Sequence, residues 1–259
     1  MGLDEKIVQW NSTEQEVDFS CCLGEMLHNS AMMFAEHTAA VDQNGSMTYE
    51  MLDKCSNAVC NYLIGKKEHI NNGIVCVMTD EIKERLCYIS GILKAGMTYV
   101  PLDKKAPLGR NLDIVRNVNG NTILTDDVCR ESAKKIAGSS DSLIEVFTVE
   151  QLGQMDCTYR NLHRDISETA YIIHTSGSTG VPKGVKVSER ALINLCAGTR
   201  AIFDITPDDR TCMLQNVSFD YSMLDIFPFM LGGAMLYFVP AQIKYHLHEQ
   251  DFLFRFQAS

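Results

Sequence analysis

A short segment rich in glycine and hydroxyl side chains is the part of this sequence best suited to chemistry. Residues 175–184 read Thr-Ser-Gly-Ser-Thr-Gly-Val-Pro-Lys-Gly. Glycines let the backbone turn with positive φ and approach a ligand closely, and successive backbone N–H groups in such a turn form a concave anion site. The hydroxyls add donors, and the lysine adds a positive charge after a stiff proline. The segment predicts a phosphate-binding loop formed by Thr175, Ser176, Gly177, Ser178, Thr179, Gly180 and Lys183.

The order of residues separates this loop from two other nucleotide-binding motifs. A Walker loop requires Gly-x-x-x-x-Gly-Lys-Ser/Thr, but Lys183 is followed by Gly184, which has no hydroxyl for Mg²⁺. The dinucleotide pattern Gly-x-Gly-x-x-Gly is absent from the segment. A flexible Ser/Gly linker is the plain structural alternative. Linkers usually have polar flanks, however, whereas strand-like apolar runs at 171–173 and 185–187 lie on both sides of this loop.

An aspartate in an apolar stretch is the second candidate for chemistry. Asp220 lies between Phe219 and Tyr221, ahead of a mostly apolar run. Burying a carboxylate is costly unless a positive group meets it, so a buried Asp220 predicts a cationic partner. Aspartate is also a common N-cap at the start of an apolar helix. From spacing alone, both roles stay open.

Composition limits the classes of function. The 259 residues are 46% hydrophobic, which is enough for a substantial core in one large domain or two smaller ones. The formal net charge of −10 argues against a general nucleic-acid or anionic-membrane surface, because such surfaces need clustered Lys and Arg. An anionic ligand must therefore be held locally, and we expect neither a nucleic acid nor a membrane as partner.

Targeting signals and cysteine spacing indicate the compartment. No segment offers the ~18 continuous apolar residues that a membrane span needs, and the N-terminus lacks an apolar signal core. The ten cysteines scatter without the spacing of zinc ligands. We therefore expect a cytoplasmic protein with reduced, mostly buried thiols and no metal site of its own.

Alternating strand and helix patterns must position the candidate residues. An apolar run at 74–78 predicts a buried strand, a helical spacing from 82 to 93 follows, and 98–102 predicts the next strand of a parallel βαβ unit. Further strands are expected at 122–124, 144–149, 171–173, 185–187, 211–215 and 234–239, and helices at 111–118, 131–136, after Ser188 and at 219–231. This pattern predicts an α/β fold with mostly parallel sheets, in two layered subdomains whose boundary lies near residues 150–168.

The glycine-rich loop resembles the phosphate-binding signature of the adenylate-forming, or AMP-binding, superfamily. Three more segments resemble motifs of this family in the same order. Residues 47–52 resemble the weak first motif, and 92–103, ending in Lys-Ala-Gly-Met-Thr-Tyr-Val-Pro-Leu-Asp, resemble the second in its peptide-synthetase form. Residues 218–225 resemble the fourth, and their last residue is similar to an Asp of the D-alanine-activating members. The resemblance runs from about residue 10 to 240 and is strongest to the N-terminal part of a nonribosomal peptide synthetase adenylation domain or a D-alanine–carrier protein ligase.

The resemblance implies a reaction and a ligand set. An amino-acid carboxylate would attack the α-phosphate of Mg·ATP to give an aminoacyl-AMP, and the acyl group would then pass to the phosphopantetheine thiol of a carrier protein. The cofactors implied are ATP and Mg²⁺. Asp220 would bind the substrate's amino group, with Tyr221 and Leu224 lining its pocket. Two alternatives stay open, an acyl-CoA ligase type of adenylation and a catalytically inactive nucleotide-binding or interaction module.

The resemblance also implies a division of the chain. We expect an N-terminal arm at 1–45, a first α/β subdomain at 46–165, and a second, truncated subdomain with the phosphate loop at 166–259. The family's ligand for Mg²⁺ and its catalytic lysine would fall beyond Ser259, so we expect no catalytic residue here. The chain alone should therefore be inactive, and the remaining C-terminal part of the enzyme should be a partner. His174 stands where the family usually has Tyr or Phe.

Overall fold

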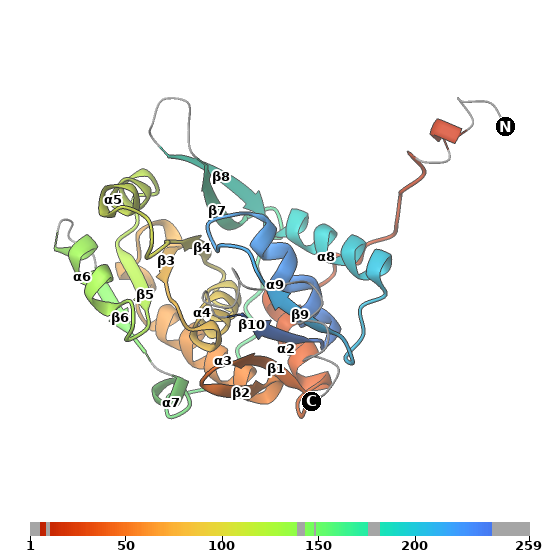
Figure 1. Ribbon diagram of the computed structural model, residues 1–259, viewed down its shortest axis with the longest axis horizontal. Coiled ribbons are helices and arrows are strands. Elements are labelled where there is room, and N and C mark those ends of the chain that lie inside the picture. The colour runs from red at the N-terminus through yellow and green to blue at the C-terminus, as the bar shows by residue number, and fades with distance from the viewer. Residues whose placement is uncertain (1–5, 9–10, 139–142, 148, 176–181, 240–259) are drawn as a thin grey trace.

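Two β-sheets and the helices packed on them form the described part of the chain, which in the computed structural model is residues 6–8, 11–138, 143–147, 149–175 and 182–239 (Figure 1). The larger sheet has the strand order β6-β5-β3-β4-β7-β8, and the smaller one has the order β2-β1-β10-β9. The strands of the larger sheet are β3 (Ile74–Met78), β4 (Thr98–Pro101), β5 (Thr122–Thr125), β6 (Leu143–Val146), β7 (Thr169–Thr175) and β8 (Lys183–Ser188). Those of the smaller sheet are β1 (Thr38–Asp42), β2 (Gly45–Thr48), β9 (Arg210–Met213) and β10 (Met235–Phe238).

Most strand pairs are parallel, which confirms the expected α/β class. In the larger sheet only β7 and β8 pair antiparallel, and in the smaller sheet only β1 and β2 do so. The helices are α2 (Leu23–Met33), α3 (Tyr49–Gly65), α4 (Ile82–Lys94), α5 (Leu108–Asn117), α6 (Arg130–Ala137), α7 (Val149–Leu152), α8 (Glu189–Phe203) and α9 (Tyr221–Gly232). Short 3₁₀ turns occupy Lys67–His69 and Asn71–Gly73.

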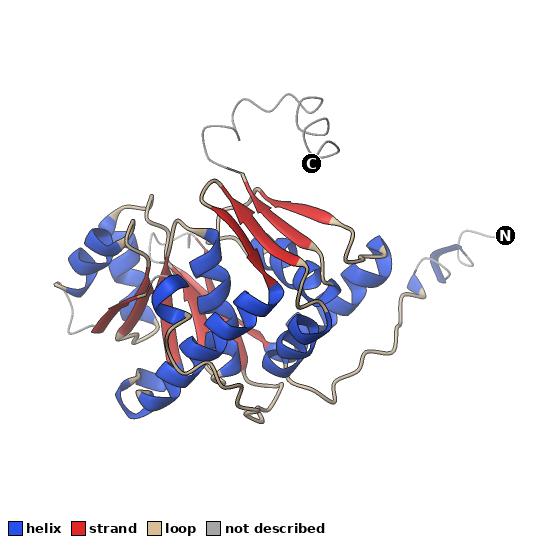
Figure 2. Cartoon of the chain, turned by 90° about the horizontal axis from the view of Figure 1, so that it is seen from below, coloured by secondary structure: helices blue, strands red, loops and turns tan. Residues whose placement is uncertain are grey.

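Helix α4 lies between the two sheets. It contacts β3 and β4 of the larger sheet and β1 of the smaller one, and almost all of its residues are buried. Figure 2 shows helices between the sheets, where the main apolar core forms. Helices α5 and α6 cover the opposite face of the larger sheet through a second core that includes Val100, Ile114 and Ile136.

The βαβ unit predicted from the sequence is present. Strands β3 and β4 pair in parallel, with Val75 opposite Tyr99, and α4 connects them. The helix ends where expected because Gly96 takes a positive φ of 67°, a conformation that costs glycine little. Ser188 also acts as predicted, since its side chain accepts a hydrogen bond from the backbone N–H of Ala191 at the start of α8.

The division of the chain into layers differs from the expectation. Strand β4 pairs with β7 and β1 pairs with β10, so each sheet joins strands from both sides of residue 165. The boundary expected near 150–168 therefore does not separate the sheets. Residues 23–42, expected within an N-terminal arm, form α2 and β1, and Leu23 and Leu27 belong to the main core. Buried strands need paired neighbours for their backbone groups, and those neighbours can be distant in sequence.

Smaller differences concern the ends of elements. The strand expected at 144–149 ends at Val146, and α7 begins at Val149. The helix expected at 219–231 begins at Tyr221, two residues later than expected. All ten cysteines are free thiols and most are buried, as expected. Among the described residues, no helix has both the length and the apolar character needed to cross a membrane.

A buried cluster of charged and amide groups joins α3 to the end of α4. The ammonium of Lys94 donates to Asp53 Oδ1 at 2.6 Å, to Ser56 Oγ at 2.7 Å and to Asn57 Oδ1 at 2.8 Å. His28 Nδ1 lies 2.9 Å from the same Asp53 oxygen. The Lys94 side chain is only 3% exposed, and this burial lowers its pKa although Asp53 favours the charged form.

Candidate functional site

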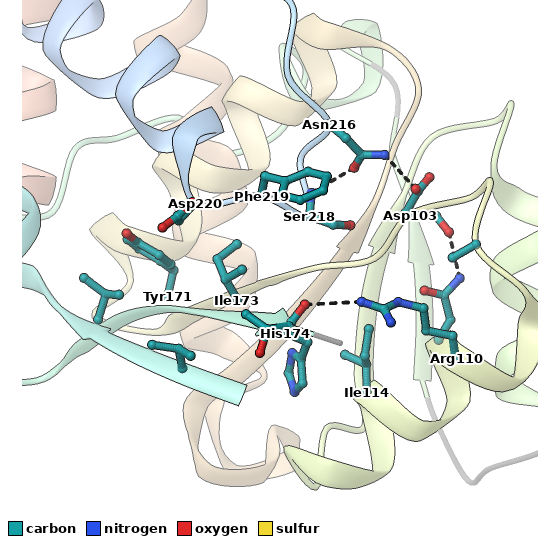
Figure 3. Close-up of a pocket in the computed structure, with 15 residues that line it drawn as sticks. Asp103, Arg110, Ile114, Tyr171, Ile173, His174, Asn216, Ser218, Phe219 and Asp220 are labelled. Atoms are coloured by element: carbon teal, nitrogen blue, oxygen red, sulfur yellow. Dashed lines mark hydrogen bonds between the residues drawn. The ribbon is translucent and has the colours of Figure 1, made fainter. Parts of the chain in front are cut away.

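A pocket of about 530 Å³ opens at the carboxyl ends of β4 and β7 (Figure 3). Ligands of open α/β sheets bind at this edge, outside the carboxyl ends of the parallel strands. Asp103 follows β4, Thr175 ends β7, Arg110 comes from the first turn of α5, and Phe219 and Asp220 lead into α9. Segments 103–111, 171–175 and 216–220 thus form one cavity although they lie far apart in sequence.

The predicted phosphate loop connects the two strands of a hairpin at the edge of the larger sheet. Strands β7 and β8 pair antiparallel, with Thr175 opposite Lys183, and project together in Figure 1. The flanking strands predicted at 171–173 and 185–187 are therefore confirmed. Thr175 is exposed and lines the pocket, and Lys183 is exposed at the start of β8. The other predicted loop residues lie outside the described part of the chain, namely Ser176, Gly177, Ser178, Thr179 and Gly180.

A set of hydrogen bonds centred on Asp103 ties the segment after β4 to the segment before α9. Asp103 Oδ2 accepts from Asn216 Nδ2 at 2.7 Å, and Asp103 Oδ1 accepts from the backbone N–H of Lys105 at 2.8 Å. The Asp103 carbonyl accepts from Asn111 Nδ2 at 2.8 Å, and Asn216 Oδ1 accepts from the Ser218 N–H at 2.9 Å. Residues 92–103 and 218–225 were recognised only as motifs, and the structure shows that their ends meet at the pocket.

Several residues of the pocket were missed by sequence reasoning, among them Arg110, Asn111 and Asn216. Arg110 and Asn111 lie in an ordinary amphipathic helix, where an arginine and an asparagine carry no distinctive signal. The available signal was their distance along the chain, since they follow Asp103, the end of the Tyr-Val-Pro-Leu-Asp segment, by seven and eight residues. Only the packing of α5 beside β7 places them on the pocket wall.

The imidazole of His174 is buried beside α5. Its Nε2 lies 3.1 Å from Asn117 Oδ1, and its Nδ1 has no hydrogen-bond partner among the described residues. Burial, and then the positive charge of Arg110, lower the pKa of His174. The position of the ring also explains why residue 184, which pairs with His174 across the hairpin, is a glycine. A Cβ at position 184 would lie 3.0 Å from His174 Nε2 and 2.9 Å from Ile172 Cγ2.

Replacing His174 with phenylalanine is expected to make the free energy of unfolding less sensitive to acid. The folded-state pKa of His174 is depressed, so its contribution is complete above the unfolded value of roughly 6.5 and is lost as pH falls towards the folded value. Chemical denaturation of both proteins at a series of pH values below about 7 measures the two slopes. The exposed His163, changed to phenylalanine, is the control. Equal slopes for wild type and His174→Phe would contradict the expectation.

Asp220 lies on the pocket wall, but not as a buried carboxylate. It is exposed, and its Oδ1 accepts a hydrogen bond from the backbone N–H of Tyr221 at 2.8 Å, as the N-cap of α9. The expectation of burial is therefore wrong, because residues 216–220 form a surface turn ahead of the apolar helix. Tyr221 is 56% exposed, Leu224 is half-buried, and neither is among the described residues that line the pocket.

The part of the chain that the structure describes has no group of three or more His, Cys, Asp or Glu side chains placed to hold a metal ion. The two carboxylates of the pocket, Asp103 and Asp220, come from different segments. Mg²⁺ in nucleotide sites is commonly held by one or two carboxylates together with substrate phosphates and waters, so either carboxylate could contribute one ligand.

Comparison with known proteins gives consistent results. Residues 27–254 match the family model described as AMP-binding enzyme. Bacitracin synthase 1 of Bacillus licheniformis is 33% identical over 88% of this chain, and malpinin synthetase of Mortierella alpina is 31% identical over 87%. Tyrocidine synthase 1 of Brevibacillus parabrevis is 30% identical over 84%. The chain spans 4%, 3% and 20% of these three proteins, respectively.

Solved structures show the same architecture. The crystal structure of the nonribosomal peptide synthetase FmoA3 in its AMPPNP-bound form superposes with a TM-score of 0.78 and 25% identity, over 92% of this chain and 25% of that one. VinN superposes with a TM-score of 0.76 over 86% of this chain and 57% of that one, and at 20% identity it supports the fold alone. With the family model covering residues 27–254, the chain belongs to the family of AMP-binding enzymes.

Proposed function

We propose that this pocket takes part in the ATP-dependent activation of an amino-acid carboxylate as an aminoacyl-AMP. One observation carries the proposal. Thr175, at the root of the phosphate loop, and Asp220, the candidate for binding the substrate's amino group, line the same cavity. A site that joins an amino acid to a nucleotide needs both ligands within reach of each other, and the membership of the AMP-binding family supports this reading.

The reaction joins one oxygen of the substrate carboxylate to the α-phosphorus of ATP and releases pyrophosphate. Catalysis of such a transfer is mainly positioning and stabilisation of charge. In our proposal the loop from Thr175 to Gly180, with Lys183, holds the outer phosphates, while Asp220 pairs with the substrate ammonium. Tyr221 and Leu224 stay proposed contacts of the amino acid. Mg²⁺ would neutralise phosphate charge when bound.

The later steps are proposed from the relatives. Peptide synthetases are among the proteins this chain resembles, which favours a carrier-protein phosphopantetheine thiol as the acceptor of the acyl group. The chain spans only a small share of those proteins. We therefore propose that a longer form of the protein, which carries the family's later motifs, catalyses the complete reaction. Those motifs would supply the rest of the site beside this pocket.

Lys183→Ala tests the phosphate-binding role of the loop. We expect the mutation to weaken ATP binding by about 1–3 kcal/mol, because a hydrogen bond to a charged group is lost. Isothermal titration calorimetry of wild type and variant measures the change. Lys186→Ala is the matched control, since Lys186 is exposed on the same strand but lies opposite Ile172 instead of Thr175. Equal ATP affinity for wild type and Lys183→Ala would remove the loop from the proposed function.

A further inference from the structure

The guanidinium of Arg110 lies on the pocket wall, and most of its donors have no partner among the described residues. Its Nη2 donates one hydrogen bond, to the carbonyl oxygen of His174 at 3.3 Å (Figure 3). An arginine has five N–H donors. Within the described residues, no carboxylate forms an ion pair with Arg110, whereas Arg116 on the same helix lies 3.9 Å from the Asp113 carboxylate.

The two carboxylates that line the pocket are engaged elsewhere. Asp103 accepts hydrogen bonds from Asn216 Nδ2 and from the Lys105 N–H, one on each oxygen. Asp220 caps α9 through its Oδ1. Neither carboxylate pairs with Arg110 in the described structure, so this half-buried cation lacks an internal counter-ion.

The surroundings of Arg110 also suit an external ligand. Asn111, the next residue of α5, is 2% exposed and lines the pocket, and its Nδ2 donates to the Asp103 carbonyl. Its Oδ1 has no hydrogen-bond partner among the described residues, and as an acceptor it suits a donor such as a ligand hydroxyl, not a phosphate oxygen. The first turn of α5 faces the cavity through Arg110 and Asn111, and the N-terminal end of a helix dipole favours negative charge. For an anionic ligand, the cavity therefore offers the Arg110 cation and the N-terminal end of α5.

We propose that Arg110 is a phosphate-binding residue of this pocket, a second cation beside Lys183 that contacts a phosphate group of the nucleotide directly. The planar guanidinium fork matches two oxygens of one phosphate, which a lysine ammonium cannot do. Arg110 reaches the root of the loop from α5, and Lys183 reaches it from β8, so the two cations flank the end of β7. The proposal rests on the proposed function for its source of phosphate, the nucleotide.

The test titrates four proteins with ATP and, separately, with inorganic pyrophosphate. They are wild type, Arg110→Ala, Arg110→Lys and the control Arg116→Ala, each measured by calorimetry at two salt concentrations. We expect Arg110→Ala to weaken both ligands about 10- to 100-fold and to reduce the salt dependence of binding, since a direct ionic contact is lost. Arg110→Lys keeps the charge but loses the fork, and should lie between wild type and alanine. Arg116→Ala should match wild type.

The outcomes separate this inference from the proposed function. If wild type binds ATP and both Arg110 variants bind it equally well, the inference is wrong and the proposed function stands. An equal loss in Arg116→Ala would indicate a general charge effect and would also overturn the inference. If wild type binds neither ligand, both proposals fail. Pyrophosphate binding that depends on Arg110, in a chain that does not bind ATP, would support phosphate binding and contradict the proposed function. Should Arg110→Ala fail to fold, Arg110→Lys decides by the same criteria.

Discussion

Replacing Lys94 with alanine is expected to lower the free energy of unfolding by about 3–5 kcal/mol, because the change removes the lysine cation from the buried carboxylate of Asp53, which keeps only its contacts with His28 and Asn57. The ammonium also binds Ser56 and Asn57, so three hydrogen bonds are lost together. Urea denaturation of wild type and variant measures the difference.

Lys54→Ala is the matched control for this change. Lys54 lies on α3 and pairs with Glu50, but both side chains are about half exposed, so its loss should cost far less stability than the loss of Lys94. A double variant, Lys94→Met with Asp53→Leu, should lose less stability than Lys94→Ala because no charge is left buried. A loss below about 1 kcal/mol for Lys94→Ala would show that the cluster is not a stabilising ion pair.

Asp220→Asn, in a form of the enzyme extended through the family's later motifs, is expected to reduce amino-acid-dependent pyrophosphate exchange about 10- to 100-fold. The asparagine oxygen can still cap α9, since Asn and Asp are similarly good N-caps, but the negative charge that would pair with the substrate ammonium is gone. Stability and ATP affinity should stay close to wild type. Pyrophosphate-exchange assays across the twenty amino acids measure the effect.

Asp220→Ala completes this experiment. It should reduce exchange as much as Asp220→Asn and also cost about 0.5–2 kcal/mol of stability through loss of the cap. If the Asp220→Asn variant catalyses pyrophosphate exchange like wild type and only the Asp220→Ala variant is impaired, Asp220 is an N-cap and does not bind the substrate.

The 259-residue chain is assayed beside the extended form. Robust turnover by the shorter chain would contradict the proposed need for the later motifs.

Local features of the fold were predictable from the sequence. The run at 74–78, the helix ended by Gly96 and the cap at Ser188 all depend on residues within one or two helical turns of each other. Their side-chain periodicity, backbone freedom and short-range hydrogen bonds act in the same way wherever the segment lies. The β-strands on both sides of the phosphate loop were predictable for the same reason.

Tertiary packing decided the features that depend on distant contacts. The pairing of β4 with β7 places Asp103 and Thr175 at one edge of the sheet, and no local pattern specifies that neighbour. Burial is likewise a property of the whole fold. The polar residue Lys94 is enclosed because α4 lies between two sheets, whereas Asp220, in an apolar stretch, is exposed because its turn lies at the surface.

The sequence by itself thus determined the class of fold, the two strands that flank the predicted phosphate loop and the likeness to adenylate-forming enzymes, since these depend on local patterns and on motif order. Only the tertiary structure decided which side chains share the pocket. Arg110 lies beside the start of the predicted loop, where it donates a hydrogen bond to the carbonyl oxygen of His174. Its helix, α5, carries no sequence pattern that indicates a binding site. The physical reason is that a binding site depends on distances between segments, which the chain acquires only when its strands pair and its helices pack.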